Sequence, residues 1–194
     1  MKHKYNYQMN VGKENNYNQR LNDYDVAKQA EQSFAEFVPS IKQDGFKLID
    51  VSGDKEYQKQ DVDFLGVYRS GYTEKIEIKH DTTCFDGRKT GNLCFEIKQR
   101  GVSQNGREYQ LDGWFITSKA DTLIMMSDIE GEDDYLCTEF DLEELRRLYK
   151  EKPNLFKTVT AYHGCVNILI GYKTLINELG PICCWRYEHV ERVD

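Results

Sequence analysis

The stretch QDVDFLGVYRSGYTEKIEIKH, which spans residues 60–80, contains two short runs that alternate apolar and polar side chains. Alternation with a period of two is typical of β-strands that bury one face. We therefore predict one strand over 61–68 and a second over 73–80, with Gly71 in the turn between them. Two such strands favour an antiparallel pair, and the remaining elements of the chain are interpreted around it.

The alternation places charged side chains on one face of the second strand. Ile76 and Ile78 would face one side of the sheet, and Glu77 and Lys79 the other. Asp63 lies fourteen residues before Glu77, on the preceding strand. If the strands pair, both carboxylates can converge on one cation while the Lys79 amine points into the same space. Mg²⁺ prefers oxygen ligands, so the pattern predicts a divalent-cation site.

The segments that flank this strand pair form a mixed pattern of helices and strands. Apolar residues recur at helical spacing over 25–38, before a proline, which predicts a helix there. Further predicted elements are strands over 46–51, 93–97, 122–126, 135–140 and 166–170, and helices over 141–150 and 173–179. The strands over 46–51, 61–68, 73–80 and 93–97 are expected to form a meander packed on the first helix. Residues 100–109 are interpreted as a loop, and 185–187 as a tail. The fold class predicted is α/β (α+β), a mixed sheet flanked by helices.

The length of 194 residues suits one domain of ordinary size. Residues 1–22 are rich in Asn, Tyr, Gln and Lys and nearly lack aliphatic side chains. They cannot bury enough apolar surface to offset the entropy of ordering, so we interpret them as a flexible arm. We expect 23–194 to form a single domain, with a core over about 25–126 and a C-terminal extension over 127–194.

The net charge of −7 is unevenly distributed. Residues 128–144 hold nine acids and no base, so the rest of the chain carries a formal charge of +2. Residues 88–107, in contrast, have an excess of four positive charges. Because affinity for nucleic acid comes mostly from Lys and Arg, this basic segment is a candidate phosphate-binding strip. The candidate nucleic-acid-binding residues are Arg88, Lys89, Lys98, Arg100 and Arg107.

The six cysteines, at positions 84, 94, 137, 165, 183 and 184, show no C-x-x-C spacing. We interpret them as reduced thiols, since neither a disulfide framework nor a zinc module is indicated by such spacing. A zinc site formed by His163, Cys165, Cys183 and Cys184 is a less favoured alternative. No apolar run approaches the roughly 20 residues needed to cross a bilayer, and no secretory signal is present. We therefore expect a cytoplasmic protein with no membrane contact.

Two segments resemble the motifs of the PD-(D/E)xK nuclease superfamily, in particular small phage-type nuclease or Holliday-junction-resolvase-like domains. Residues 60–65 match its aspartate motif and residues 76–79 its E-x-K motif, although the proline of the family name is missing. Residues 90–96 and 113–121 also look like segments of these domains. The resemblance implies a restriction-endonuclease-like fold and Mg²⁺- or Mn²⁺-dependent hydrolysis of phosphodiester bonds, in DNA more than in RNA.

The resemblance also assigns roles to individual residues. Asp63, Glu77 and the backbone carbonyl of Ile78 would bind the cation, and Lys79 would orient or activate the attacking water. Asp61 competes with Asp63 as the main metal ligand, because both would face the same way on an alternating strand. Glu31 would supply an auxiliary carboxylate from the first helix. Glu96 would supply a second carboxylate from the strand after the E-x-K motif, and Lys119 would bind a phosphate.

A second hypothesis comes from a different functional class. A nuclease-like domain without activity would bind nucleic acid or a protein partner, with the acidic segment 128–144 imitating phosphate charge. Intact Asp63, Glu77 and Lys79 speak against it, because a pure binding role gives no reason to hold two carboxylates beside a phosphate. The sequence leaves the oligomeric state open, a homodimer included.

Overall fold

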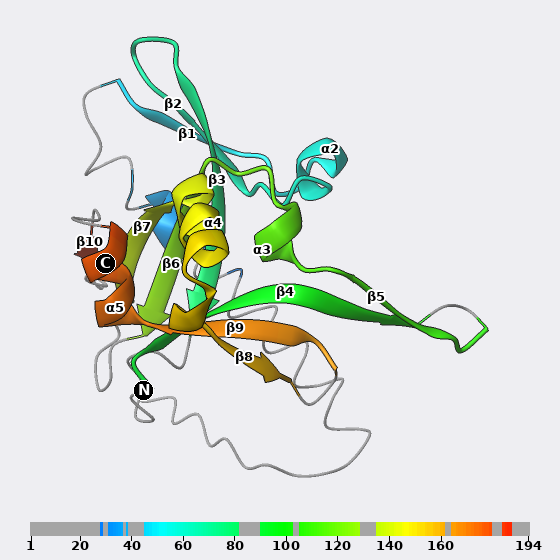
Figure 1. Ribbon diagram of the computed structural model, residues 1–194. Coiled ribbons are helices and arrows are strands. Elements are labelled where there is room, and N and C mark those ends of the chain that lie inside the picture. The colour runs from blue at the N-terminus through cyan, green and yellow to red at the C-terminus, as the bar shows by residue number, and fades with distance from the viewer. Residues whose placement is uncertain are drawn as a thin grey trace, which may run out of the picture.

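The computed structural model contains two β-sheets with short helices packed around them (Figure 1). The residues that it describes are 28, 31–36, 38, 45–81, 90–102, 105–128, 135–161, 164–179 and 184–187. The predicted arm over 1–22 lies outside these residues. Helices and strands occur in mixed order, so the expected mixed α/β (α+β) fold class is confirmed.

The larger sheet has six strands in the order β1-β2-β3-β6-β7-β10. Their bounds are Lys47–Asp50 (β1), Phe64–Val67 (β2), Thr73–Asp81 (β3), Thr122–Asp128 (β6), Tyr135–Asp141 (β7) and Cys184–Tyr187 (β10). All neighbours are antiparallel except β3 and β6, which are parallel. The predicted pairing of the two strands within 60–80 is confirmed, and β10 forms where the sequence was interpreted as a tail.

The smaller sheet has four antiparallel strands in the order β5-β4-β9-β8. The bounds are Asn92–Val102 (β4), Glu108–Asp112 (β5), Lys157–Thr160 (β8) and Val166–Gly171 (β9). The predicted four-strand meander is therefore wrong at its last member. β4 leaves the larger sheet and pairs with β9, where Leu93 lies opposite Ile170 and Phe95 opposite Ile168. The apolar alternation of β4 indicated a strand but carried no information about its distant partner.

The prediction of a loop over 100–109 is also wrong in part. β4 continues to Val102 and pairs with β5, with Gly101 opposite Tyr109. A Cβ atom at Gly101 would lie 2.3 Å from a ring carbon of Tyr109, so glycine here permits close cross-strand packing rather than breaking the strand. The far end of the β4–β5 hairpin projects beyond the rest of the smaller sheet (Figure 1).

The helices predicted over 141–150 and 173–179 are confirmed as α4 (Leu142–Glu151) and α5 (Tyr172–Leu179). Three short elements were not predicted: α2 (Lys55–Gln58), α3 (Trp114–Thr117) and the 3₁₀ turn η1 (Pro153–Leu155). Helical geometry at 28, 31–36 and 38 agrees with the predicted first helix. The Asp141 carboxylate accepts a hydrogen bond from Glu144 N at 2.9 Å and so caps α4. Among the described helices, none is long and apolar enough to span a membrane.

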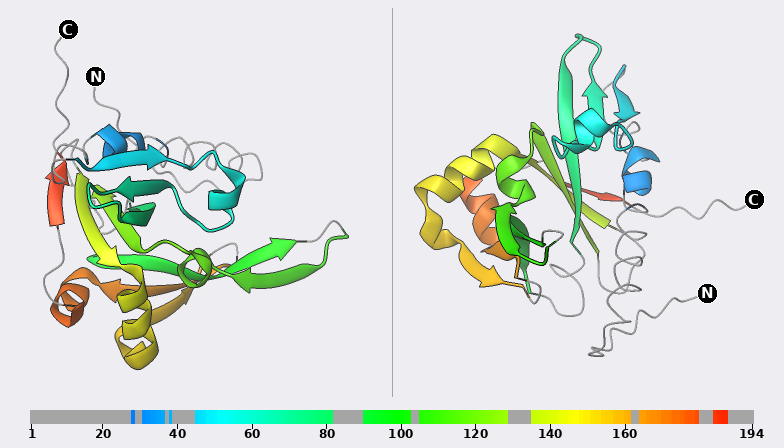
Figure 2. Two further views of the ribbon diagram at one scale, coloured as in Figure 1. Left: turned by 90° about the horizontal axis from the view of Figure 1, so that it is seen from above. Right: turned by 90° about the vertical axis from the view of Figure 1, so that its right-hand side faces the viewer.

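Two apolar clusters cover the two faces of the larger sheet. Ile76 and Ile78 on β3 pack on one side with Phe34 of the N-terminal helical segment. On the other side Leu123 and Met125 of β6 pack with residues of β4, β9, α3, α4 and α5. Helices therefore flank both faces of the sheet (Figures 1 and 2). The alternation of β3 directs its even positions to the first cluster and its odd positions toward the second, where the candidate site lies.

Candidate active site

Asp63 immediately precedes β2, Glu77 lies on β3, and both side chains line the same cavity. The register of β2 and β3 ends where Phe64 pairs with Ile76. Asp63 N donates a hydrogen bond of 2.9 Å to Ile76 O, so Asp63 and Phe64 both lie beside Ile76, as in a β-bulge. The structure thus brings together the two carboxylates that the sequence singled out.

Asp63 is held in place by the backbone of β3. Its Oδ2 accepts a hydrogen bond of 2.8 Å from Ile78 N, which orients the carboxylate across the start of the strand pair. Burial raises the pKa of Asp63, and the hydrogen bond from Ile78 and the charge of Lys79 act against that rise. A position that raises the pKa of a carboxylate also favours its pairing with a positive charge.

Glu77 is the most buried charged side chain of the site, with 1% of its surface exposed. One carboxylate oxygen, Oε1, forms an ion pair with Lys79 Nζ, and the other, Oε2, is buried without a hydrogen-bond partner. Burial raises the pKa of Glu77 to about 8, and nearby Asp63 adds to the rise while Lys79 opposes it. A buried oxygen without a partner is unfavourable, so this atom marks a place where a ligand would be stabilising.

Lys79 is two residues along the same face of β3, as predicted. Its side chain is 32% exposed, and its ammonium group lies between the Glu77 carboxylate and the ring of Trp114, 5.2 Å from the ring centroid. Burial by itself would lower the pKa of Lys79, but the negative charges of Glu77 and Asp63 outweigh this effect and raise it. The amine is therefore held as an ammonium ion, a donor of hydrogen bonds.

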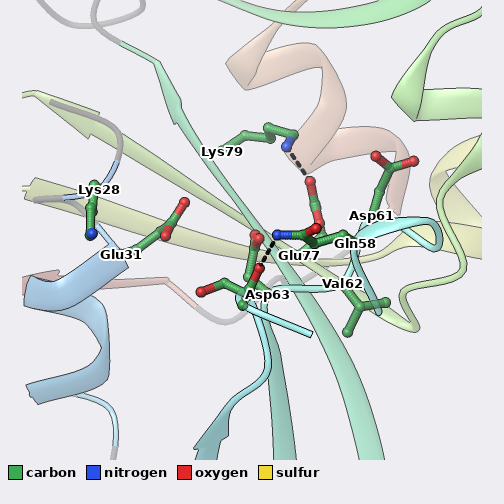
Figure 3. Close-up of a pocket in the computed structure, with 10 residues that line it drawn as sticks. Lys28, Glu31, Gln58, Asp61, Val62, Asp63, Glu77 and Lys79 are labelled. Atoms are coloured by element: carbon green, nitrogen blue, oxygen red, sulfur yellow. Dashed lines mark hydrogen bonds and ion pairs between the residues drawn. The ribbon is translucent and has the colours of Figure 1, made fainter. Parts of the chain in front are cut away.

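A cavity of about 420 Å³ joins these residues to Glu31 (Figure 3). Glu31 reaches it from the N-terminal helical segment, on the side where Asp63 lies. Burial raises the pKa of Glu31 to about 7, with a further contribution from Asp63. The auxiliary carboxylate predicted on the first helix is thus near Asp63, Glu77 and Lys79.

Asp61 reaches the same cavity from a turn, not from a strand. β2 begins only at Phe64, so the prediction that Asp61 faces like Asp63 along an alternating strand is wrong. Asp61 has a φ of 51°, in the left-handed region that non-glycine residues rarely adopt. Its Oδ2 accepts a hydrogen bond of 3.1 Å from Thr117 Oγ1, and its carbonyl one of 3.0 Å from Ser118 Oγ. Strained backbone of this kind is frequent at functional sites.

The hydroxyls of Thr117 and Ser118 are contributions to the site that sequence reasoning missed. They lie in the 113–121 segment, which resembled the nuclease domains but received no role beyond Lys119. Because Thr117 is 56 residues from Asp61 along the chain, no local pattern connects them.

Thr117→Val tests the contact between Thr117 and Asp61. Valine keeps the branched shape but removes the hydroxyl, so we expect the free energy of unfolding to fall by about 1 kcal/mol in urea titrations. Thr158→Val, at an exposed position of β8, is the matched control and should change it by less than about half as much. Equal effects of the two substitutions would show that Thr117 does not hold Asp61.

Metal-free protein is expected to lose stability as the pH rises from about 5 to 9. Burial raises the pKa of Glu77 from its ordinary value of 4.5 to about 8 in the folded chain, so the folded state binds this proton more tightly. The stabilisation is complete below pH 4.5 and is lost as the pH passes through 8. Thermal melting in EDTA should show a Tm lower by about 5 °C at pH 9 than at pH 6, and Glu77→Gln should reduce that difference. An identical pH profile for the variant would contradict this cause.

The remaining candidate residues lie apart from the cavity lining or outside the described chain. Glu96 is on β4, in the smaller sheet, and is not among the residues that line the cavity. Lys98 forms an ion pair with Asp112 across the β4–β5 hairpin, and Arg100 one with Glu108. Arg107 immediately precedes β5, at the turn end of the hairpin, and Lys119 is exposed after α3. Arg88 and Lys89 lie outside the described residues, so no continuous basic strip can be traced.

The donor set suits a hard cation that keeps water ligands. Mg²⁺ is commonly bound through one or two carboxylates while it retains several waters. Glu77 Oε2, buried and without a hydrogen-bond partner, and Asp63 in the lining of the same cavity fit this need. Within the described ranges no group of three or more His, Cys, Asp or Glu residues forms a metal site by itself. The alternative zinc site involves His163 and Cys183, which are not described, and Cys165 is a buried free thiol.

No protein-family model, no curated protein and no solved structure matches this chain. The resemblance to PD-(D/E)xK nucleases consequently rests on short motifs and their order. The residues around the cavity therefore carry the functional assignment.

Proposed function

We propose that this chain is a divalent-metal-dependent nuclease that hydrolyses phosphodiester bonds, in DNA more than in RNA. The observation that carries the proposal is that Asp63, Glu77 and Lys79 line one cavity, where the Lys79 ammonium pairs with the Glu77 carboxylate. Two carboxylates facing each other repel a phosphate unless a cation lies between them. The preference for DNA rests on the motif resemblance alone.

In this function Asp63 and Glu77 would hold Mg²⁺ or Mn²⁺, with the Ile78 carbonyl as a further ligand. When bound, such an ion would supply a Lewis acid that polarises the phosphate and lowers the pKa of a water. Lys79 donates hydrogen bonds to the attacking water and places positive charge near the phosphate, where negative charge develops. Asp63 keeps its orientation through the Ile78 amide, and Asp61 adds a negative charge held by Thr117.

The experiment is a cleavage assay on a panel of single-stranded, double-stranded and branched DNA and RNA. We expect DNA to be degraded with Mg²⁺ or Mn²⁺ and to stay intact with EDTA. Readdition of excess Mg²⁺ should restore cleavage, which separates metal removal from denaturation. If the wild-type protein leaves every substrate intact at high Mn²⁺, the nuclease proposal is refuted, and binding measurements on the same panel then test the non-catalytic binding module.

A further inference from the structure

The position of Lys79 on β3 leaves its side chain without a neighbouring strand on one side. β2 pairs with β3 only as far as Ile76, and the hydrogen bond from Asp63 N is the last contact of that ladder. On the other side Lys79 lies opposite Met125 of β6. Within the described residues no strand flanks β3 beyond this point on the β2 side, so no neighbouring strand on that side positions the Lys79 side chain.

Two groups contact the Lys79 ammonium: Glu77 on the same strand and Trp114 of α3. Glu77 pairs with the ammonium group, and Trp114 presents its ring face at 5.2 Å from Nζ. This separation lies within the roughly 6 Å over which a cation is attracted to an aromatic face, and Trp is the most effective ring for it. The ammonium therefore has two partners, one of which is a predicted metal ligand.

Trp114 is itself held rigidly against the smaller sheet. Its ring meets those of Phe95 and Phe115 at centroid distances of 6.1 Å and tilts of 64° and 89°. Both phenylalanines are fully buried. Gly113 allows α3 to begin this close to β4, because a Cβ atom there would lie 2.4 Å from the Glu96 carbonyl oxygen. The ring is a fixed surface against which Lys79 rests.

We propose that Trp114 is the positioning residue of Lys79. Its ring gives the ammonium a second binding place, so that Glu77 can release Lys79 to bind a cation while the amine stays at the cavity. Without the ring, Lys79 would either remain paired with Glu77 or move into solvent. The catalytic consequence rests on the proposed nuclease function, whereas the contact between Lys79 and Trp114 does not.

The contact is tested by tryptophan fluorescence without cation or nucleic acid. Trp114 and Trp185 are the two tryptophans of the chain, so Trp185→Phe leaves Trp114 as the single emitter. We expect Lys79→Met in this background to shift the Trp114 emission maximum, because the charge over the ring is removed. Lys79→Arg should keep an emission close to that of the parent, since a guanidinium group also stacks on aromatic faces. Identical emission with Lys and Met would overturn the proposal.

The consequence for the cation is tested by calorimetric titration with Mg²⁺ alone. We expect Trp114→Leu to weaken Mg²⁺ binding about threefold to tenfold, which corresponds to one cation–π contact. Trp114→Phe, which keeps a ring face, should restore most of the affinity. In a Lys79→Met background Trp114→Leu should have no effect, because the cation over the ring is already absent. Equal weakening in both backgrounds would show a merely structural role and overturn the proposal.

Tyr149 offers a control within the same aromatic cluster. It contacts Phe115 at a centroid distance of 6.0 Å from the α4 side. Tyr149→Leu should lower the melting temperature but leave the Mg²⁺ affinity unchanged, whereas a loss of affinity equal to that of Trp114→Leu would refute the specific role of Trp114. If the wild-type protein binds no Mg²⁺ at all, the proposed function and the catalytic consequence fail together, and the emission test still decides the contact.

Discussion

Glu77→Gln is expected to lower kcat/KM for cleavage by on the order of a thousandfold. The same substitution is expected to make the metal-free fold more stable. Glutamine keeps the length and shape of the side chain but cannot hold a divalent cation with a full negative charge. The variant also no longer has to keep a carboxylate in a place that raises its pKa to about 8. We expect the free energy of unfolding at pH 8 in EDTA to rise by about 1 kcal/mol, because burying a charge is unfavourable.

This opposite response of activity and stability separates a functional site from an ordinary salt bridge. Glu151→Gln at the exposed end of α4 is the matched control and should change neither quantity appreciably. Urea titrations in EDTA and cleavage rates with Mg²⁺ measure the two effects. A Glu77→Gln protein that cleaves at the wild-type rate would refute the metal-binding role. One that loses both activity and several kcal/mol of stability would show that Glu77 serves the fold.

Lys79→Ala is expected to lower kcat by about a hundredfold to a thousandfold and to leave KM nearly unchanged. The amine stabilises charge that develops in the transition state, so its removal affects turnover more than substrate binding. Mg²⁺ affinity should not fall, because Glu77 loses the cation that competes for its carboxylate. Single-turnover cleavage and Mg²⁺ titration measure the two quantities.

Two further variants serve as controls for Lys79→Ala. Lys79→Met keeps a long aliphatic side chain but removes the charge over Trp114, and it shows whether a lost rate reflects missing charge or a disturbed fold. Lys157→Met, at an exposed position of β8, removes a lysine far along the chain and should leave the rate unchanged. Circular dichroism and thermal melting confirm that each variant is folded. Undiminished kcat in both Lys79 variants would exclude the proposed role of the amine.

Local patterns were sufficient for the elements that bear the site. The alternation over 73–80 correctly predicted that Ile76 and Ile78 face an apolar core and that Glu77 and Lys79 share the other face. The turn at Gly71 correctly predicted the antiparallel partner of β3. These features depend on side chains only a few residues apart. Because side chains alternate along a strand, each residue can face only one of two sides of the sheet, and the apolar residues determine which side faces the core.

Partners distant in sequence were not predictable in this way. The parallel contact of β3 with β6, the transfer of β4 to the smaller sheet and the strand β10 join segments far apart along the chain. An alternating strand fits many partners equally well, and only the packing of whole faces selects one. The loop predicted around Gly101 failed for the same reason, because the space beside that glycine is filled by Tyr109 from another strand.

The amino-acid sequence by itself determined which residue types could meet on one face of β3: two carboxylates and an amine at fixed strand spacing. Only the tertiary structure decided that Glu77 is buried with an oxygen lacking a partner, that Trp114 lies against Lys79 and that Thr117 holds Asp61. The physical reason is that strand alternation is set by bonds within the chain. Burial, charge pairing and the contacts of α3 instead arise when surfaces from distant segments exclude water together.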